Sequence, residues 1–235
     1  MSLFSEITSL PASFDGLVRL FPLPNLVMFP QVVQPLHIFE PRYCDMLEEA
    51  MATDQLLTLA LLQPGWEQQY VGRPPLEPVA CVGRIVSHTR LPEGRHNVLL
   101  LGLKRVSITY ELPASAAFRR ARVELLDDEP GSLSAAQRDQ KRERLMSVFR
   151  QAAVNIELQQ QIDQLLAQDL KLGMLCDVVA FTSSLDTAMK QRLLAETNVD
   201  RRANLLIRAM EKAVSLSNVP SPSARGEFPP EFSLN

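Results

Sequence analysis

Proline placement is the feature that most constrains the fold of this chain. Residues 20–43 (LFPLPNLVMFPQVVQPLHIFEPRY) set five prolines among leucine, valine, isoleucine and phenylalanine. A proline has no backbone N–H and a fixed φ, so the centre of a sheet cannot hold it. The apolar residues between the prolines must nevertheless be buried. The stretch therefore predicts short strands, broken by turns, at the rim of a small barrel or sheet.

The prolines also divide the chain. Ten of the 17 prolines lie within residues 1–78, whereas residues 131–219 contain none. An interior proline costs a helix about 3 kcal/mol, so long helices belong in the proline-free half. We place the boundary near residues 128–134. The expected parts are an N-terminal extension (1–14), a β-rich part (15–128), a helical part (133–217) and a flexible tail (218–235).

The first half reads mainly as strands, because its apolar runs are short or alternate with polar residues. The expected strands are 17–23, 32–38, 56–62, 82–89, 98–110 and 118–126, with one helix at 40–52. Strand 56–62 is apolar throughout and should be covered on both faces, as should residues 99–101. Gly102 should mark a bulge after which the pattern alternates, and Gly94 should supply a positive φ to a hairpin turn.

The pattern of the second half predicts four or five helices, several of which have recognisable start signals. Ser134 and Gln137 have the form of a capping box. Asp186 should cap a helix at 187–196, and Thr197 with Asp200 should cap the last helix. Further helices are expected at 156–168 and around 172–179.

Composition excludes several classes of protein. A net charge of −3 and a pI near 5.7 argue against binding nucleic acid by neutralising many phosphates. Three cysteines without a CxxC pair suggest reduced thiols rather than disulfides or zinc. The sequence has no signal peptide and no run of about 18 apolar residues. We therefore expect a cytoplasmic protein that does not span a membrane and needs no cofactor.

Two motifs together resemble the N-terminal substrate-binding domain of ATP-dependent Lon proteases. Residues 37–43 read HIFEPRY, an ending that standalone relatives of that domain often carry. Residues 82–108 resemble its central hairpin, with LPEG at 91–94 and LGLKR at 101–105; Leu101 replaces a common glutamate. The resemblance covers about residues 15–217. It implies an α+β fold, a PUA-like β pseudo-barrel with one helix followed by an α-helical bundle.

The resemblance also implies binding without catalysis. No glycine precedes a lysine, so the phosphate-binding loop of an ATPase is absent, and neither GxSxG nor HExxH occurs. The expected function is recognition of unfolded or partly folded polypeptides, or of one specific protein partner, in protein quality control or as an adaptor. The sequence leaves the oligomeric state and the client open.

Several side chains are candidates for polypeptide binding. Met28, Phe29, Arg42 and Tyr43 are expected to form an exposed apolar rim with a charged edge, and Phe39 belongs to the same motif. A structural interpretation of the motif competes: Phe39 would anchor a strand end, and Arg42 would pair with a nearby carboxylate. Trp66 would either anchor a partner or fold back to plug the barrel end. The candidate residues are Met28, Phe29, Phe39, Arg42, Tyr43 and Trp66.

Other functions remain open at this point. His37 and Cys44 are seven residues apart and could line the pocket of a small enzyme. The simpler interpretation is a histidine at a strand end and a thiol that faces the core or the helix surface. By fold analogy, a PUA-like protein could also bind a small ligand or RNA. His88 and His96 should face each other across the hairpin as exposed residues, and two histidines alone make a poor metal site.

Overall fold

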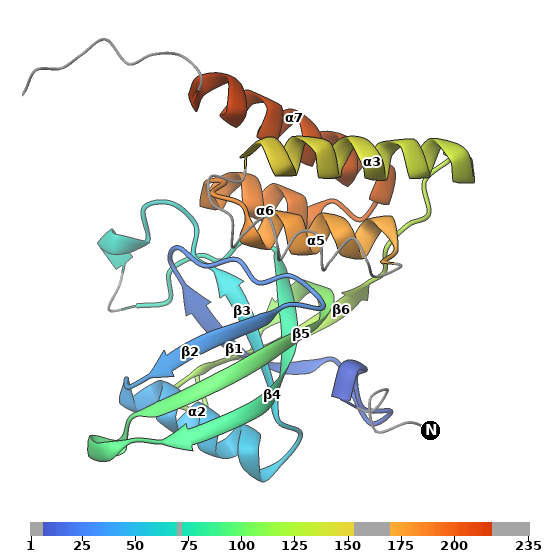
Figure 1. Cartoon of the computed structure of the whole chain (residues 1–235). Coiled ribbons are helices and arrows are strands. Elements are labelled where there is room, and N and C mark those ends of the chain that lie inside the picture. Colours follow the sequence, from blue (N-terminus) through green and yellow to red (C-terminus); the bar gives the residue numbers. More distant parts are fainter. Residues whose placement is uncertain (1–6, 70–71, 153–169, 218–235) are drawn as a thin grey trace, which may run out of the picture.

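A six-stranded sheet and a group of helices make up the computed structural model of this protein (Figure 1). The structure describes residues 7–69, 72–152 and 170–217. The strands are β1 (Leu17–Leu23), β2 (Val33–Ile38), β3 (Leu56–Leu61), β4 (Val79–Arg90), β5 (His96–Glu111) and β6 (Arg119–Leu126). The helices are α2 (Pro41–Ala52), α3 (Ala135–Ala152), α5 (Leu172–Thr182), α6 (Thr187–Ala195) and α7 (Val199–Ser217), with the 3-10 helices η1 (Trp66–Gln69) and η2 (Pro92–Gly94).

Five of the strands close a barrel, and β2 lies outside it. The strand order is β2-β5-β4-β3-β1-β6, and β5 also pairs with β6, which closes the circuit. β1 and β3 run parallel, and the other neighbours are antiparallel. The predicted α+β fold, with a pseudo-barrel first and a helical bundle second, is confirmed.

The barrel interior and the surface beneath the helices form two separate cores. The interior is narrow and takes many small side chains, namely Val18, Leu20, Leu56, Ala60, Ala80, Val82, Leu103, Val106, Ala121 and Val123. The outer core runs from α2 across the strands and into the helical bundle as one cluster. Every residue of β3 is buried, since Leu56 and Ala60 face the interior and Leu57 and Leu59 face the outer core. The expectation that this strand is covered on both faces is confirmed.

Gly102 marks a bulge, as expected, and the structure shows why a glycine is needed there. The pairing of β4 with β5 shifts register between Val82 and Gly83, and Gly83 is the residue that pairs with Gly102. The Gly102 N–H donates to the Val32 carbonyl (2.9 Å), and its own carbonyl accepts from the Gln31 N–H (2.8 Å). A Cβ on Gly102 would lie 2.0 Å from the Phe29 carbonyl oxygen. The backbone of residues 29–32 therefore packs directly on this glycine.

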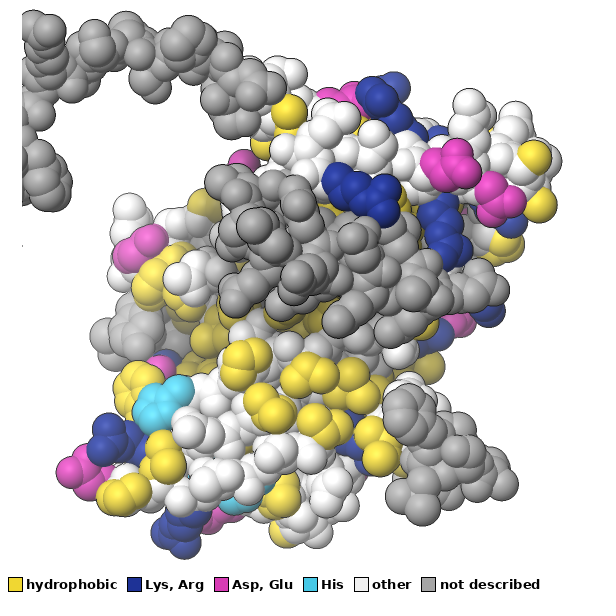
Figure 2. Space-filling model, viewed as in Figure 1, with side chains coloured by type: hydrophobic (Ala, Val, Ile, Leu, Met, Phe, Trp, Pro, Cys, Tyr) yellow, Lys and Arg dark blue, Asp and Glu magenta, His cyan; other side chains and the backbone are white. Residues whose placement is uncertain are grey.

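The outer face of β5 is not covered in the way that we expected. Leu100 is fully buried, but Leu99 is 41% exposed beside Pro35 of β2, with which it pairs. Val33 of β2 is 46% exposed, and Figure 2 shows hydrophobic side chains gathered over β2 and β5 on this face. The expectation that residues 99–101 are covered on both faces is wrong at Leu99, because β2 adds an outer edge to the sheet rather than a covering layer.

Helix starts follow the sequence with one exception. The Ser134 and Gln137 side chains bond reciprocally to each other's backbone N–H, and Asp186 accepts from the Met189 N–H at 2.7 Å. The last helix is capped by Asn198, whose side chain accepts from the Arg201 N–H at 3.0 Å. The prediction that Thr197 is the cap is therefore wrong by one residue. The helix expected at 156–168 lies outside the described residues.

A buried set of charges joins the barrel to the bundle. Arg105 of β5 donates through Nε to the Leu194 carbonyl (2.9 Å) and forms an ion pair with Asp177 of α5. Arg202 of α7 forms two bonds to Asp128, at 2.8 and 2.6 Å, and also lies 3.4 Å from Asp177. Arg105, Asp177 and Arg202 are each at most 3% exposed. Burial opposes ionisation of Asp128, but Arg202 and Arg105 outweigh it and hold the pKa of that carboxyl below its usual value.

Candidate functional site

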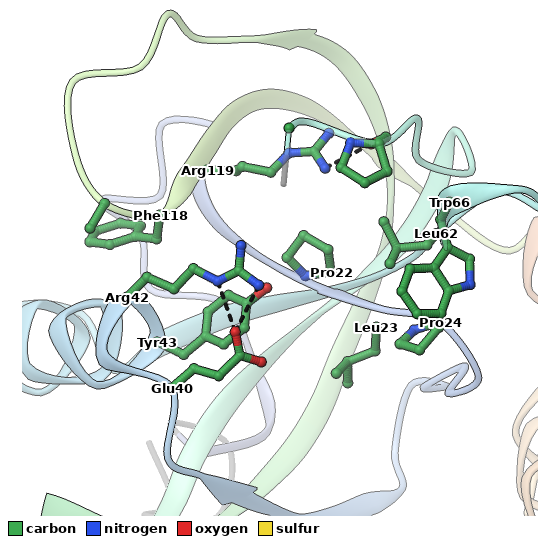
Figure 3. Close-up of a pocket in the computed structure, with 13 residues that line it drawn as sticks. Pro22, Leu23, Pro24, Glu40, Arg42, Tyr43, Leu62, Trp66, Phe118 and Arg119 are labelled. Carbon is green, nitrogen blue, oxygen red and sulfur yellow. Dashed lines mark hydrogen bonds and ion pairs between the residues drawn. The ribbon is translucent and has the colours of Figure 1, made fainter. Parts of the chain in front are cut away.

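A pocket opens where the barrel seam between β1 and β6 comes apart. β6 pairs with β1 only along residues 17–20, whereas β1 continues beside β3 as far as Leu23. Pro22 and Pro24 lie beyond the last β6 pair and have no N–H with which to extend that pairing. The two prolines therefore keep the seam open and contribute to the pocket wall (Figure 3).

This seam pocket has a volume of about 230 Å³. Its apolar walls are Pro22, Leu23, Pro24, Leu62, Trp66 and Phe118. Pockets that take cofactors or drug-sized ligands usually measure about 300–1,000 Å³. The seam pocket is thus of a size for one or two amino-acid side chains.

The start of α2 supplies a charged edge to the pocket. Glu40 precedes the helix and Pro41 occupies its first turn, where a missing N–H costs nothing. Arg42 bonds to the Glu40 carboxylate at 3.0 and 2.7 Å, and its guanidinium lies 4.6 Å from the centre of the Tyr43 ring. The expected pairing of Arg42 with a nearby carboxylate is confirmed. Both partners are about one-third exposed, so the pair is worth about 0–1 kcal/mol and can be exchanged for a ligand group.

Tyr43 and Trp66 form aromatic walls of the pocket, and Tyr43 is the more deeply buried of the two. Tyr43 is 6% exposed and its ring centre lies 4.5 Å from that of Phe21, so the core fixes it. Trp66 is half-buried in η1, which follows a turn at Gly65 with φ of +86°. In Figure 3 the indole lies beside Leu62 and Pro24. Trp66 therefore lines the wall of the pocket.

The long loop that carries Trp66 is fixed at both of its ends. The Gln63 N–H donates to the Pro75 carbonyl (2.9 Å), and the Glu77 N–H donates to the Leu61 carbonyl (2.8 Å). Arg119 bonds to the Pro74 carbonyl at 2.8 Å and to the Glu111 carboxylate at 2.9 Å. The start of β6 is thereby tied to the loop, and the pocket walls are preorganised.

The structure brings together three of the six residues predicted to bind polypeptide. Arg42, Tyr43 and Trp66 line the seam pocket. Met28 and Phe29 are 1% and 0% exposed in the outer core, so the expectation that they form an exposed rim is wrong. They are buried because residues 29–32 pack against β5 at Gly102.

Phe39 does not behave as a strand anchor. Its side chain is 61% exposed and lies outside the seam pocket, with its ring centre 5.9 Å from that of His37. The expectation that it anchors the end of a strand is wrong. Its role in binding stays a prediction.

Other pocket residues were missed by sequence reasoning. Pro22 and Pro24 were identified as strand breakers, but their position at the seam depends on where β6 stops pairing, which no local pattern encodes. Phe118 is 7% exposed, and the Arg120 guanidinium lies 5.0 Å from the centre of its ring. Nothing in the neighbouring sequence distinguishes it from an ordinary strand residue.

The rival sites do not assemble. His37 Nδ1 lies 2.8 Å from Asn97 Oδ1, whereas the Cys44 thiol lies 3.5 Å from the Gly94 carbonyl, so the two engage different partners. Burial, followed by the charges of Asp45 and Glu48, raises the pKa of the Cys44 thiol, which disfavours a nucleophilic thiolate.

His88 and His96 face each other as predicted, with Nε2 of His88 2.8 Å from Nδ1 of His96. His96 is only 4% exposed, so the expectation that both histidines are exposed is wrong for His96. Among the described residues, no group of three or more His, Cys, Asp or Glu side chains is placed to hold a metal ion.

The fold and its family agree. The family model of one domain, the ATP-dependent protease La (LON) substrate-binding domain, matches residues 18–212 of the sequence. The chain therefore belongs to the family of Lon substrate-binding domains.

Individual relatives show how much of a Lon protease the chain corresponds to. It is 29% identical over 202 residues to a Lon protease of Xanthomonas oryzae pv. oryzae, covering 84% of this chain and 23% of that protein. It is 25% identical over 213 residues to a Lon protease of Rhizobium meliloti, covering 89% of this chain and 26% of that protein. The chain thus spans about a quarter of the length of these curated relatives.

Two solved structures share the fold. The N-terminal domain of a Mycobacterium avium complex Lon protease superimposes with a TM-score of 0.64 at 17% identity, covering 83% of this chain and 98% of that domain. A Lon N-terminal domain protein from Xanthomonas campestris gives a TM-score of 0.60 at 19% identity, covering 82% and 97% respectively.

Proposed function

We propose that this chain is a non-catalytic polypeptide-binding module whose seam pocket takes an apolar side chain of a client. The observation that carries the proposal is the seam itself, where Tyr43, Trp66 and Phe118 surround a preformed apolar pocket. Membership of the Lon substrate-binding family supports a role in recognition rather than in bond breaking.

The contact chemistry suits loosely specified clients. Burying one large apolar side chain contributes about 1.5–3 kcal/mol, and that contribution depends on area rather than on sequence. Association costs several kcal/mol, so one pocket gives weak binding unless neighbouring residues add contacts. Arg42 is placed to add one, because its exposed pair with Glu40 can exchange for a client carboxylate or carbonyl.

The biological setting is part of the proposal. Recognition of unfolded or partly folded chains fits protein quality control, and recognition of one specific partner fits an adaptor. The three cysteines are free thiols, which suits the reducing cytoplasm. In the described part of the chain, no helix is long and apolar enough to cross a bilayer.

Trp66 provides the test, because it is the only tryptophan in the sequence. A reduced, carboxymethylated client is titrated into the protein while Trp66 emission is followed. We expect a saturable change in the wavelength of Trp66 emission, since a client side chain that enters the pocket alters the surroundings of the indole. The same client in its native disulfide-bonded form is the control and should give no shift. Binding of the unfolded client with unchanged Trp66 emission would remove the seam pocket from the proposal.

A further inference from the structure

The rim of the seam pocket carries more positive than negative charge. Arg42 faces Glu40, and Arg119 faces Glu111. Among the charged side chains that line the pocket, two are positive, Arg42 and Arg119, and one is negative, Glu40. A ligand that places a carboxylate beside an apolar side chain would complete the charge balance.

The protein's own sequence contains such a ligand beyond the described residues. Residues 226–232 read GEFPPEF, in which Phe228 and Phe232 each follow a glutamate. Two prolines lie between the phenylalanines, and proline pairs favour the extended polyproline II conformation. Segments of that kind dock on grooves lined by aromatic side chains. The seam pocket has three aromatic walls, Tyr43, Trp66 and Phe118.

The segment is close enough along the chain to reach the pocket. α7 ends at Ser217, and the residues from there to Phe228 can extend about 36 Å. A folded chain of this length has a radius of gyration of about 17 Å, so that reach spans much of the molecule. A tethered ligand is also present at an effective concentration on the order of 1 mM, which fills even a weak site.

We propose that residues 226–232 bind the seam pocket of the same molecule, with one phenylalanine inserted and its preceding glutamate at Arg42. This inference rests on the proposed function and adds a built-in competitor. A client must displace the segment, so the segment lowers apparent client affinity. With the effective concentration above and weak intrinsic binding, we expect that reduction to be roughly tenfold.

The test compares the full chain with the double variant Phe228→Ala/Phe232→Ala. The expected result is emission of Trp66 at longer wavelength, stronger quenching by acrylamide and roughly tenfold tighter binding of the carboxymethylated client. Leu234→Ala is the matched control and should behave as the unmodified chain. A synthetic peptide of residues 224–235, added to the double variant, should restore the original emission.

The outcomes separate this inference from the proposed function. If the double variant matches the unmodified chain in emission, quenching and client affinity while the client still shifts Trp66, the inference is overturned and the proposed function stands. If neither client nor peptide changes Trp66 emission, both fall. Quenching that changes when the unmodified chain is diluted would also overturn binding within one molecule.

Discussion

At the scale of single residues, the histidine pair on the β4–β5 hairpin is held together by a hydrogen bond that depends on pH. The hydrogen bond between His88 and His96 needs one ring nitrogen to accept, so it is lost when both rings are protonated. Burial lowers the pKa of His96, and the nearby charges of His88 and Arg90 lower it further, against a smaller opposing effect of Glu48. The folded protein therefore resists protonation at this site.

This lowered pKa predicts a loss of stability in mild acid. An unfolded histidine titrates near pH 6.5, so between that pH and the lower folded pKa the unfolded state binds more protons. The contribution of His96 to the free energy of unfolding is fully present above about pH 6.5 and falls as the pH drops through this window. The loss is about 1.4 kcal/mol for each tenfold difference in proton affinity between the folded and unfolded states. Urea unfolding at pH 7.5 and 5.5 measures the difference in the free energy of unfolding. His96→Gln should reduce the difference between the two pH values; an undiminished difference in that variant would assign it to other groups.

Two arginines illustrate what the sequence can predict about single residues. Arg42 was expected to pair with a carboxylate, and it does, because its partner Glu40 is two residues away. Arg105 alternates with apolar residues along β5, a pattern typical of a strand with one solvated face, yet it is 3% exposed. Its partners Asp177 and Leu194 are far away in sequence. A local pattern identifies the face of a strand but not what covers that face.

At the scale of elements, the passage from β1 to β2 depends on one close backbone approach. The chain between these strands crosses β5 at Gly102, with Phe29 wholly buried and Gln31 in a left-handed conformation (φ +64°). Hydrogen bonds on both sides of Gly102 hold it there. This contact positions β2 on the outside of the barrel.

Gly102→Ala should therefore destabilise the protein by about 1–3 kcal/mol, because its Cβ would meet the Phe29 carbonyl and the backbone must shift. Gly94→Ala is the matched control. Gly94, unlike Gly102, has a positive φ (+70°), but a Cβ there would meet no atom within 4 Å, so only conformational strain of about 1 kcal/mol is expected. Urea midpoints compare the two variants. Equal losses would show that the close approach at Gly102 contributes little.

Element boundaries were predictable where the signal is local. The strand at residues 17–23, the helix after Glu40 and the caps at Ser134 and Asp186 follow from proline, apolar spacing and capping chemistry. The last helix was misplaced by one residue because Thr197 and Asn198 are both good caps. Thr197 instead bonds to Glu129 (3.1 Å), a partner 68 residues away. The seam pocket was unpredictable for the same reason, since it depends on where two distant strands stop pairing.

At the scale of the whole molecule, buried charges connect the two halves. Asp177 lies between Arg105 of the barrel and Arg202 of α7, and Gln191 of α6 donates to the Val79 carbonyl at 2.8 Å. The outer core also continues from the strands into the helices. We therefore expect the two halves to unfold together rather than as separate units.

Removing the carboxylate at the centre of this network should be costly. Asp177→Ala leaves two buried guanidinium groups to share the single carboxylate of Asp128, for an expected loss of about 3–5 kcal/mol. Arg144→Ala is the control, because its ion pair with Glu211 is exposed and worth about 0–1 kcal/mol. Equilibrium urea unfolding measures both. A loss below about 1 kcal/mol in Asp177→Ala would contradict the structural role of the network.

Client affinity in two aromatic variants tests the central claim most directly. The measurement is the dissociation constant of a fluorescently labelled, carboxymethylated client by anisotropy. It is made in the Phe228→Ala/Phe232→Ala chain, in which residues 226–232 do not compete, and in the same chain carrying Trp66→Ala or Phe39→Ala, with urea midpoints to confirm folding. Trp66 lines the seam pocket and Phe39 is 61% exposed outside it. The account predicts at least about tenfold weaker binding in Trp66→Ala and a change of less than about twofold in Phe39→Ala. Unchanged affinity in Trp66→Ala together with a large loss in Phe39→Ala would contradict it and place the binding surface on the outer edge of the sheet.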